Sequence, residues 1–91
     1  VHKGTIETAY SILNGEYEVI EAEIIETSEL INKELKNTNL PDEVRIGAIL
    51  RNEEVIIPRS NFVFKKKDTV VFLSKRDHLP IIENIFRISS I

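Results

Sequence analysis

The residues in this chain that could do acid–base or metal chemistry are few and scattered. The sequence holds no cysteine and only two histidines, His2 and His78. His2 lies near the first residue, and His78 follows Asp77 at an expected helix start, where a capping or solvated role explains it. An enzyme needs a nucleophile with a base, paired carboxylates, a metal cage or a phosphate cradle, and we identify none of these sets. We therefore predict no catalytic residue and no metal site, and the lack of cysteine excludes thiol catalysis and zinc-finger ligand sets.

The glycines are too widely spaced to hold a nucleotide phosphate. They stand at positions 4, 15 and 47, so neither a G-x-G-x-x-G motif nor a P-loop is present. We expect no cofactor in this chain.

Two charged clusters leave a functional and a structural interpretation open. Glu21 and Glu23 share one face of an expected strand, where they could hold a hard cation such as calcium or simply form a solvated face. The lysines of residues 65–67, beside Phe62 and Phe64, are either a surface for stacking and phosphate contact with nucleic acid or a charged turn between strands whose rings are core. The structural interpretation is the simpler one in both cases.

Arginine offers the better candidate for binding an anion, because a guanidinium fork suits a phosphate. Arg45, Arg51 and Arg59 form a clamp if the segments that carry them converge, whereas ion pairs with the acidic half of the chain explain the same residues equally well. If the chain senses a small molecule, we expect a phosphate-bearing ligand at Arg45, Pro58, Arg59 and Asn61, with Arg59 as the main contact.

Length and composition limit the class of protein. The chain has 91 residues, of which 42% are hydrophobic and 30% charged, enough for one domain with a small core. Its longest apolar runs, 55–57 and 70–73, fall far short of the roughly 20 residues needed to cross a bilayer. Because methionine is absent and the chain opens on Val1, we expect residues 1–91 to be one domain of a longer protein. The lack of cysteine agrees with a cytoplasmic location.

Charge is divided unevenly along the chain. Residues 1–43 carry 10 acids and 3 bases (net −7), and residues 44–91 carry 5 acids and 9 bases (net +4), which together give the formal charge of −3. If the halves fold together their fields largely cancel, and no concentrated basic face is left to displace counterions from phosphates. We therefore expect no nucleic-acid partner.

A long β-hairpin is expected at residues 5–26, around Asn14-Gly15, a dipeptide typical of a two-residue type I′ turn. Both faces of this hairpin are partly apolar, so one face is expected to meet the core and the other a missing domain or a second copy of the chain. The expected cross-strand pairs are Tyr10 with Val19 and Ile12 with Tyr17 on one face, and Ala9 with Ile20 and Thr5 with Ile24 on the other.

The rest of the chain predicts further strands and two helices. Ser28 offers an N-cap for a helix of about two turns that ends near Asn37, and a second hairpin is expected around Asn52-Glu53. The apolar run that starts at Thr69 predicts a central strand covered on both faces. A last helix is expected after Asp77, with an apolar stripe at Leu79, Ile82, Ile85 and Phe86. The order β-β-α-β-β-(β)-β-α, with the bracketed strand at 62–64, is an α+β fold, mainly antiparallel sheet with an N-terminal hairpin and two helices.

Short motifs in a fixed order resemble one known family, the C-terminal domain of TrkA proteins, also called RCK-C. The resemblance covers nearly the whole chain, and the His2-Lys3-Gly4 start and Asn14-Gly15 turn are most like potassium-uptake members. The chain departs from the pattern at Asn32 and Lys67, where glycine is usual. The motifs are E-V-I-E-A-E-I from Glu18, Ser28-x-Leu30-x-Asn32-Lys33-x-Leu35, Leu40-Pro41, Val44-Arg45-Ile46-Gly47-Ala48-Ile49-x-Arg51, Val55-Ile56-Ile57-Pro58 and Lys67-Asp68-x-Val70-Val71-Phe72.

The resemblance implies a regulatory, non-enzymatic domain that forms a homodimer. It implies a neighbouring Rossmann-type domain, which binds an NAD- or ATP-type nucleotide, and a membrane potassium transporter subunit that the assembly gates from the cytoplasmic side of the membrane. Some relatives bind cyclic di-adenosine monophosphate in the dimer cleft, and we identify no residue-by-residue match to that site. Two alternatives stay open: a ligand-sensing copy in another transporter, such as an anion permease or antiporter, and one in a transcription regulator.

Overall fold

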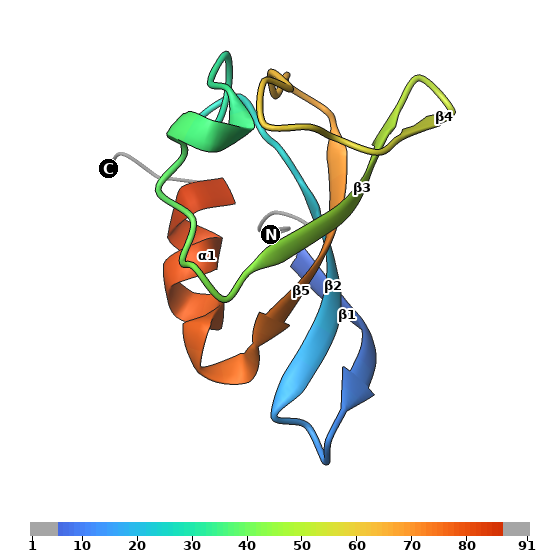
Figure 1. The fold of residues 1–91 in the computed structure, drawn as a ribbon, viewed down its shortest axis with the longest axis vertical. Helices are drawn as coiled ribbons and strands as arrows, with labels where there is room; N and C mark the ends of the chain where they lie inside the picture. Colours follow the sequence, from blue (N-terminus) through green and yellow to red (C-terminus); the bar gives the residue numbers. More distant parts are fainter. Residues whose placement is uncertain (1–5, 87–91) are drawn as a thin grey trace.

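A five-stranded antiparallel sheet with one α-helix forms the body of the chain (Figure 1). The computed structural model describes residues 6–86, with side chains from Tyr10 onward. The strand order β1-β2-β5-β3-β4 places β5 in the centre. This confirms the predicted α+β class and the central position of the apolar strand. The elements are β1 (Ile6–Ile12), β2 (Tyr17–Glu23), β3 (Arg45–Arg51), β4 (Glu54–Ile56), β5 (Thr69–Lys75) and α1 (Leu79–Phe86), with 3-10 turns at Leu35–Asn37 and Arg76–His78.

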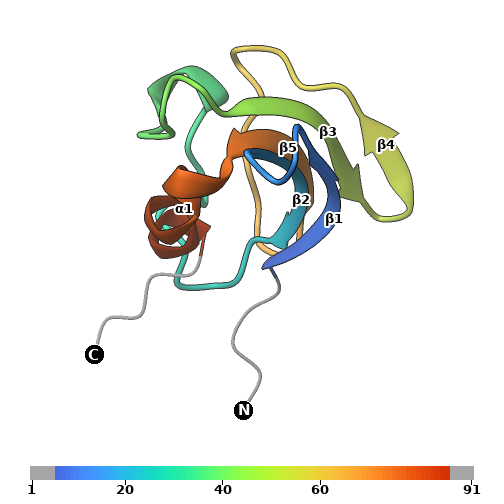
Figure 2. The ribbon, with the colours of Figure 1, turned by 90° about the horizontal axis from the view of Figure 1, so that it is seen from below.

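One face of the sheet carries the core. Helix α1 and the segment between β2 and β3 lie on the same side of the sheet in both views (Figures 1 and 2). The rings of Phe72 on β5 and Phe86 on α1 stack with centroids 5.4 Å apart. The predicted apolar stripe of the helix is confirmed, because Ile82, Ile85 and Phe86 are buried against the sheet. The other large buried side chains are Ile20, Ile24, Leu30, Ile49, Phe64 and Val70.

The opposite face of the sheet is not covered by any described part of the chain, and we call it the open face. Along β5, burial alternates residue by residue, so Val70 and Phe72 are buried while Val71 and Leu73 are only half-buried. The prediction that this strand is covered on both faces is therefore wrong for this chain taken by itself. By strand register the apolar residues of the open face are Tyr10, Ile12, Tyr17, Val19, Ala48, Leu50, Val55, Val71 and Leu73.

The first hairpin follows the predicted register near its turn and departs from it further along. The pairs Tyr10 with Val19 and Ile12 with Tyr17 are confirmed. The predicted pair of Ala9 with Ile20 is wrong, because a β-bulge between Thr8 and Tyr10 inserts a residue and puts Thr8 opposite Ile20. The predicted partner of Ile24, residue 5, lies outside the described residues.

The turn of this hairpin contains the predicted two-residue turn at Asn14-Gly15, because the Glu16 amide donates to the Leu13 carbonyl at 3.1 Å, and it extends one residue further toward the N-terminus. Leu13, Asn14 and Gly15 all adopt positive φ, at 56°, 57° and 90°. The amide of Gly15 donates to the Ile12 carbonyl at 3.2 Å, so the turn begins one residue before Asn14. The second hairpin turns at Asn52 and Glu53, as predicted.

The predicted helix ending near Asn37 is wrong except for a single 3-10 turn at Leu35–Asn37. The segment pairs instead with residues 62–64: Asn32 donates to the Phe64 carbonyl at 2.9 Å, Leu35 donates to the Phe62 carbonyl at 2.8 Å, and Phe64 donates back to the Lys33 carbonyl at 3.1 Å. Asn32 has a φ of 66°, which an α-helix does not allow. The amides and carbonyls that would form hydrogen bonds within a helix form them with residues 62–64 instead.

Candidate functional site

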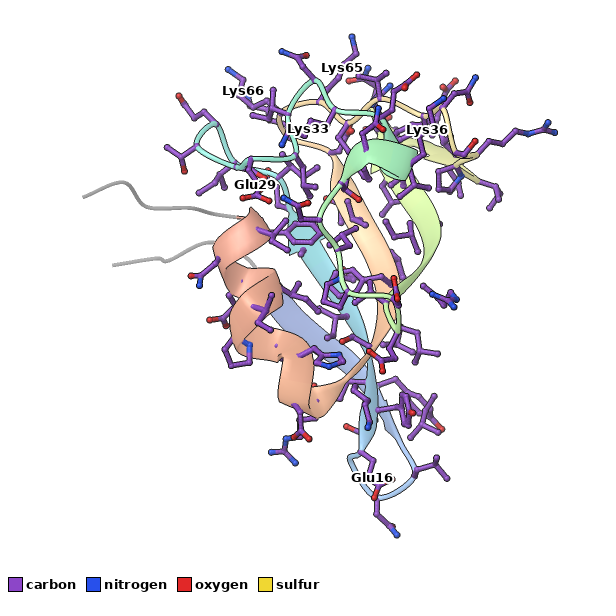
Figure 3. The ribbon with its side chains drawn as sticks, turned by 60° about the vertical axis from the view of Figure 1, so that its left-hand side comes forward. Glu16, Glu29, Lys33, Lys36, Lys65 and Lys66 are labelled. Carbon is purple, nitrogen blue, oxygen red and sulfur yellow. The ribbon has the colours of Figure 1, made fainter. Side chains whose placement is uncertain are left out.

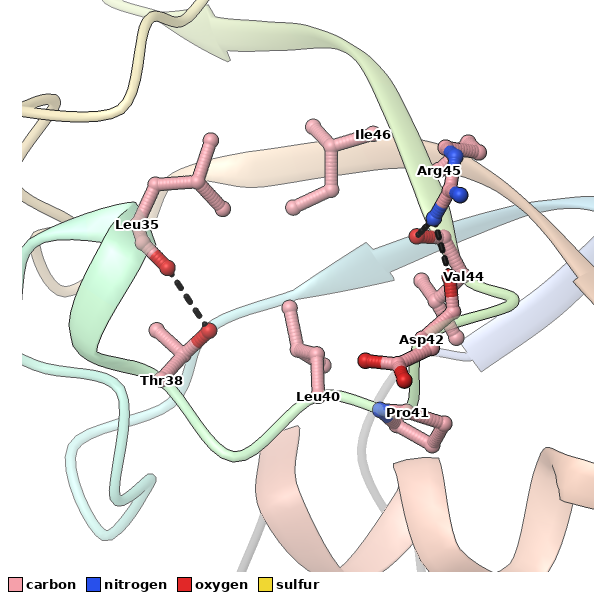
Figure 4. Close-up of a pocket in the computed structure, with 8 residues that line it drawn as sticks. All are labelled: Leu35, Thr38, Leu40, Pro41, Asp42, Val44, Arg45 and Ile46. Atoms are coloured by element: carbon pink, nitrogen blue, oxygen red, sulfur yellow. Dashed lines mark hydrogen bonds between the residues drawn. The ribbon is translucent and has the colours of Figure 1, made fainter.

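Among the residues that the structure describes, a pocket open to solvent lies on the core side of the sheet edge (Figure 4). It has a volume of about 570 Å³, within the range of roughly 300–1,000 Å³ typical of small-molecule sites. It forms where the segment between the 3-10 turn and β3 passes over the sheet edge. Its lining residues are Leu35, Thr38, Leu40, Pro41, Asp42, Val44, Arg45 and Ile46.

The pocket has an apolar floor and a polar rim. Leu35, Leu40 and Ile46 are half-buried and pack against the core, so their outer surfaces supply the apolar part. Arg45 is exposed at the rim, where its guanidinium donates to the carbonyls of Asp42 and Val44, the latter at 3.1 Å. These bonds fix the guanidinium while leaving other donor N–H groups for an anion. The rim therefore presents the Arg45 guanidinium and the Asp42 carboxylate next to an apolar floor.

Local sequence explains this geometry. Proline at position 41 supplies a carbonyl that accepts from the Val44 amide at 3.0 Å, which closes a tight turn directly before β3. The hydroxyl of Thr38 donates to the Leu35 carbonyl at 2.9 Å and ends the 3-10 turn. The two short turns leave the chain between them arched over the pocket.

The predicted ligand residues are divided between two places. Arg45 lines this pocket, whereas Pro58, Arg59 and Asn61 lie in the loop after β4 and do not line it. Arg59 is exposed, and its carbonyl accepts from the Phe62 amide at 2.9 Å. That one ligand contacts both Arg45 and Arg59 stays a prediction.

Arg51, the third arginine of the expected clamp, is already bound within the fold. Its Nε and one terminal nitrogen donate to the two oxygens of Asp68 at 2.8 and 2.7 Å, and the same terminal nitrogen reaches the Val63 carbonyl at 2.9 Å. The guanidinium lies 4.9 Å from the ring centroid of Phe62. The Asp68 carboxylate, 1% exposed, also accepts from the Lys65 amide at 2.9 Å. Hydrogen bonding to Asp68 raises the pKa of Arg51, against a smaller opposing effect of burial.

This buried pair was missed by sequence reasoning. The interpretation of the arginines as partners of the acidic half does not hold for Arg51, because Asp68 belongs to the basic half. The sequence did offer a signal for this pair, because Asp68 comes directly before the most apolar strand. A carboxylate that is buried there needs a cation or hydrogen-bond donors as partners. Arg76 does reach across the halves, with its Nε 3.8 Å from a Glu18 oxygen.

The two other charged clusters are the lysine turn beside Phe62 and Phe64 and the acidic pair Glu21 and Glu23. The ring of Phe64 is fully buried, and that of Phe62 packs edge-on against it, with centroids 5.3 Å apart. The Phe64 ring is therefore not available to stack with a base, and the half-buried Phe62 ring already contacts Phe64 and Arg51. Among residues 6–86 no group of three or more His, Asp or Glu side chains is placed to hold a metal ion.

The helices within the described part of the chain are also too short or too polar to cross a membrane.

The described residues form a small α+β domain with a pocket at one edge of its sheet. A solved structure described as "Structure of RCK domain with cda" superimposes with a TM-score of 0.62, covering 74% of this chain and 97% of that one, at 18% sequence identity. This likeness supports the fold. The family model of the TrkA-C domain matches residues 19–87, so the chain belongs to the TrkA-C domain family.

Several curated potassium uptake proteins are similar to this chain. The chain is 38% identical over 89 residues to the Trk system potassium uptake protein TrkA of Azorhizobium caulinodans, covering 98% of this chain. It is 31% identical over 94 residues to the protein of that name from Haemophilus influenzae, and 36% identical over 64 residues to a homolog from Archaeoglobus fulgidus, covering 99% and 70% of this chain. These relatives are named as potassium uptake proteins and not as enzymes. The chain spans only 15–20% of their length.

Proposed function

We propose that this chain is a regulatory domain of a Trk-type potassium uptake system that acts by self-association and by transmitting a ligand-dependent shift. The observation that carries the proposal is the 38% identity to a potassium uptake protein over 98% of the chain. That match includes the first hairpin, most of which lies before the start of the family model at residue 19. Similarity to potassium uptake proteins therefore extends beyond the general domain pattern.

The proposal includes partners outside the 91 residues. The regulatory assembly contains a neighbouring Rossmann-type domain with an NAD- or ATP-type nucleotide and works on a membrane transporter subunit from the cytoplasmic side. The chain performs no catalysis: it contributes a conformational equilibrium that a ligand shifts only by binding one state more tightly than the other.

Self-association is proposed to use the open face. Tyr10 at one edge of the sheet is 67% exposed and Val55 at the other edge is 66% exposed, with half-buried apolar residues between them. By strand register Glu21 and Glu23 lie on the same face. Water-exposed apolar surface of this extent is typical of an interaction site. We take the partner to be a second copy of the chain. A two-fold axis brings the same face of each copy together, so the apolar residues at both edges can be covered in one interface.

Sedimentation of the chain at about 100 μM tests this step, since interfaces of standard size hold at that concentration. We expect a dimer, and we expect the double variant Tyr10→Glu with Val55→Glu to be monomeric, because it places four like charges in a two-fold interface. Ile81→Glu is the matched control: Ile81 is 51% exposed on α1, away from the open face, so this variant should stay dimeric. A monomeric wild type, or loss of the dimer in both variants, contradicts the proposal.

The ligand step is proposed for the pocket at Arg45 or for the loop at Pro58, Arg59 and Asn61. Calorimetric titration with adenine mono- and dinucleotides distinguishes the two places, because loss of one charge-assisted contact lowers affinity about ten- to hundredfold. Arg45→Ala should weaken binding if the pocket is used, and Arg59→Ala if the loop is used. Absence of heat with every nucleotide at millimolar concentration would leave the chain as a dimerisation and coupling domain only.

The potassium link is tested in cells. The full-length protein carrying Tyr10→Glu and Val55→Glu is expected to lose control of potassium uptake by its transporter, whereas Ile81→Glu retains it. Normal regulation by a protein shown to be monomeric in this domain would reject the role of self-association.

A further inference from the structure

Five exposed lysines gather at one end of the sheet, and we call this surface the lysine end. Figure 3 shows four of them together at that end, with Glu16 at the opposite end of the molecule. Lys36 lies 3.8 Å from Glu34, and no ion pair is found for the other four. The lysine end consists of Lys33, Lys36, Lys65, Lys66 and Lys67.

Tertiary contacts bring these lysines together. The segment 32–36 and the segment 60–64 are joined by backbone hydrogen bonds, among them that of the Lys36 amide to the Ser60 carbonyl at 2.9 Å. The turn at 65–67 follows immediately and is fixed by the Lys67 amide, which donates to the Ile24 carbonyl at 2.8 Å. The backbone of the lysine end is therefore fixed by hydrogen bonds, while the long lysine side chains extend from it into solvent.

The acid closest in sequence does not cancel this charge. Asp68 is 1% exposed and its carboxylate is fully engaged by Arg51 and the Lys65 amide. Glu29 and Glu34 lie among the lysines, and Glu26, Glu53 and Glu54 stand in the turns next to residues 65–68, whereas Arg59 adds one cation beside Ser60. The excess of positive charge at the lysine end is therefore small.

Lys67 stands where the backbone favours glycine. Its φ is 75°, a left-handed conformation that costs free energy for a residue with a side chain. The Lys67 side chain is exposed and makes no ion pair with any residue that the structure describes. Lys67 therefore adds a cation to the lysine end at a position where its backbone conformation is unfavourable.

We propose that the lysine end contacts an anionic lipid bilayer. The neighbouring pocket, lined by Arg51, Asn52 and residues 65–68, holds only about 190 Å³, less than a small-molecule site requires. Exposed lysines spread over one end of the domain suit the surface of an anionic bilayer, because each flexible side chain can place its ammonium against a separate lipid headgroup. Nucleic acid is disfavoured because the adjacent rings of Phe62 and Phe64 are held within the fold.

Vesicle co-sedimentation of the chain tests this contact. We expect binding to vesicles with about 30% phosphatidylglycerol and none to pure phosphatidylcholine, with loss of binding between about 50 and 300 mM salt as screening increases. Lys66→Gln should weaken binding about fivefold, the effect of one juxtamembrane lysine. Arg76→Gln removes the same charge from the side chain beside Glu18, near the first hairpin's turn, and should leave binding unchanged.

Lys67→Gly separates this role from a structural one. It should keep or raise the melting temperature, because glycine relieves the positive φ, while vesicle binding falls about fivefold. Wild-type binding that does not depend on the anionic lipid, or equal binding by Lys66→Gln and Arg76→Gln, overturns the proposal. Tighter binding to an acidic polyglutamate peptide than to the vesicles also overturns it, in favour of a protein partner.

Discussion

Removal of Arg51 should destabilise the domain more than removal of its partner Asp68. The Arg51 side chain is 25% exposed, whereas that of Asp68 is 1% exposed. Arg51→Ala leaves a buried carboxylate with one remaining donor, the Lys65 amide, and we expect a loss of about 3–4 kcal/mol in the free energy of unfolding. Asp68→Ala leaves a guanidinium that still reaches water and the Val63 carbonyl, so a loss of about 2–3 kcal/mol is expected.

These losses are large for a domain of this size. A chain of 91 residues has a total stability of about 5–14 kcal/mol, and each kcal/mol corresponds to about 4–8 °C in melting temperature. Arg51→Ala should therefore lower the melting temperature by at least about 12 °C. Arg59→Ala is the matched control: Arg59 is exposed, so its replacement should change stability by less than about 0.5 kcal/mol.

Urea unfolding of both single variants and the double variant completes a thermodynamic cycle. We expect a coupling energy of about 2 kcal/mol, because the double variant leaves no buried charge unpaired. If Arg51→Ala does not fold, Arg51→Lys supplies the comparison, since it keeps the charge but loses the two-pronged geometry. A smaller loss for Arg51→Ala than for Asp68→Ala, or a coupling below about 0.5 kcal/mol, refutes the reasoning.

The pH dependence of this contribution has a definite sign. Hydrogen bonding to Asp68 raises the pKa of Arg51 above that of the unfolded chain. The stabilisation that goes with a raised pKa is fully present at pH values below the ordinary arginine pKa. It is lost only as the pH rises through the raised pKa. The stability difference between wild type and Arg51→Ala should therefore not decrease between about pH 7 and about pH 10, and a decrease there contradicts an Arg51 pKa shifted upward.

Two further predictions concern how the segment after β2 and helix α1 are held. Ser28→Ala should cost about 2 kcal/mol in thermal unfolding, because the buried hydroxyl donates to the Ile85 carbonyl at 2.8 Å and accepts from the Leu30 amide at 3.1 Å; a loss below about 0.5 kcal/mol would show that these bonds are replaced. Ile82→Ala should cost about 2–5 kcal/mol, because Ile82 is fully buried, whereas Ile81→Ala, one residue earlier and 51% exposed, should cost less than about 1 kcal/mol; similar losses would mean that α1 does not pack as described.

The sequence by itself determined the features that depend on neighbouring residues. Alternating apolar residues and Asn14-Gly15 indicated the first hairpin and its two faces, because side chains of a strand alternate with a period of two. The helical spacing of Ile82, Ile85 and Phe86 identified α1 and its buried side in the same way. The apolar run of β5 placed this strand in the centre of the sheet.

Only the tertiary structure decided the features that depend on residues far apart in the chain. Local propensity favoured a helix after Ser28, but the hydrogen bonds of Asn32 and Leu35 go to residues 62–64, and those partners cannot be inferred from spacing. Arg51 finds Asp68 across 17 positions because β3 lies beside β5. The β-bulge of the first strand shifted its register in the same unforeseen way.

The candidate sites follow the same division. The sequence identified Arg45 as an anion-binding side chain, but its position on a pocket rim depends on the arch between the 3-10 turn and β3. The lysine end joins segments 33–36 and 65–67 only because backbone hydrogen bonds pair residues 32–36 with residues 60–64. The local sequence is sufficient to predict side-chain type and short-range periodicity. The partners of long-range hydrogen bonds and ion pairs depend on how the whole chain packs.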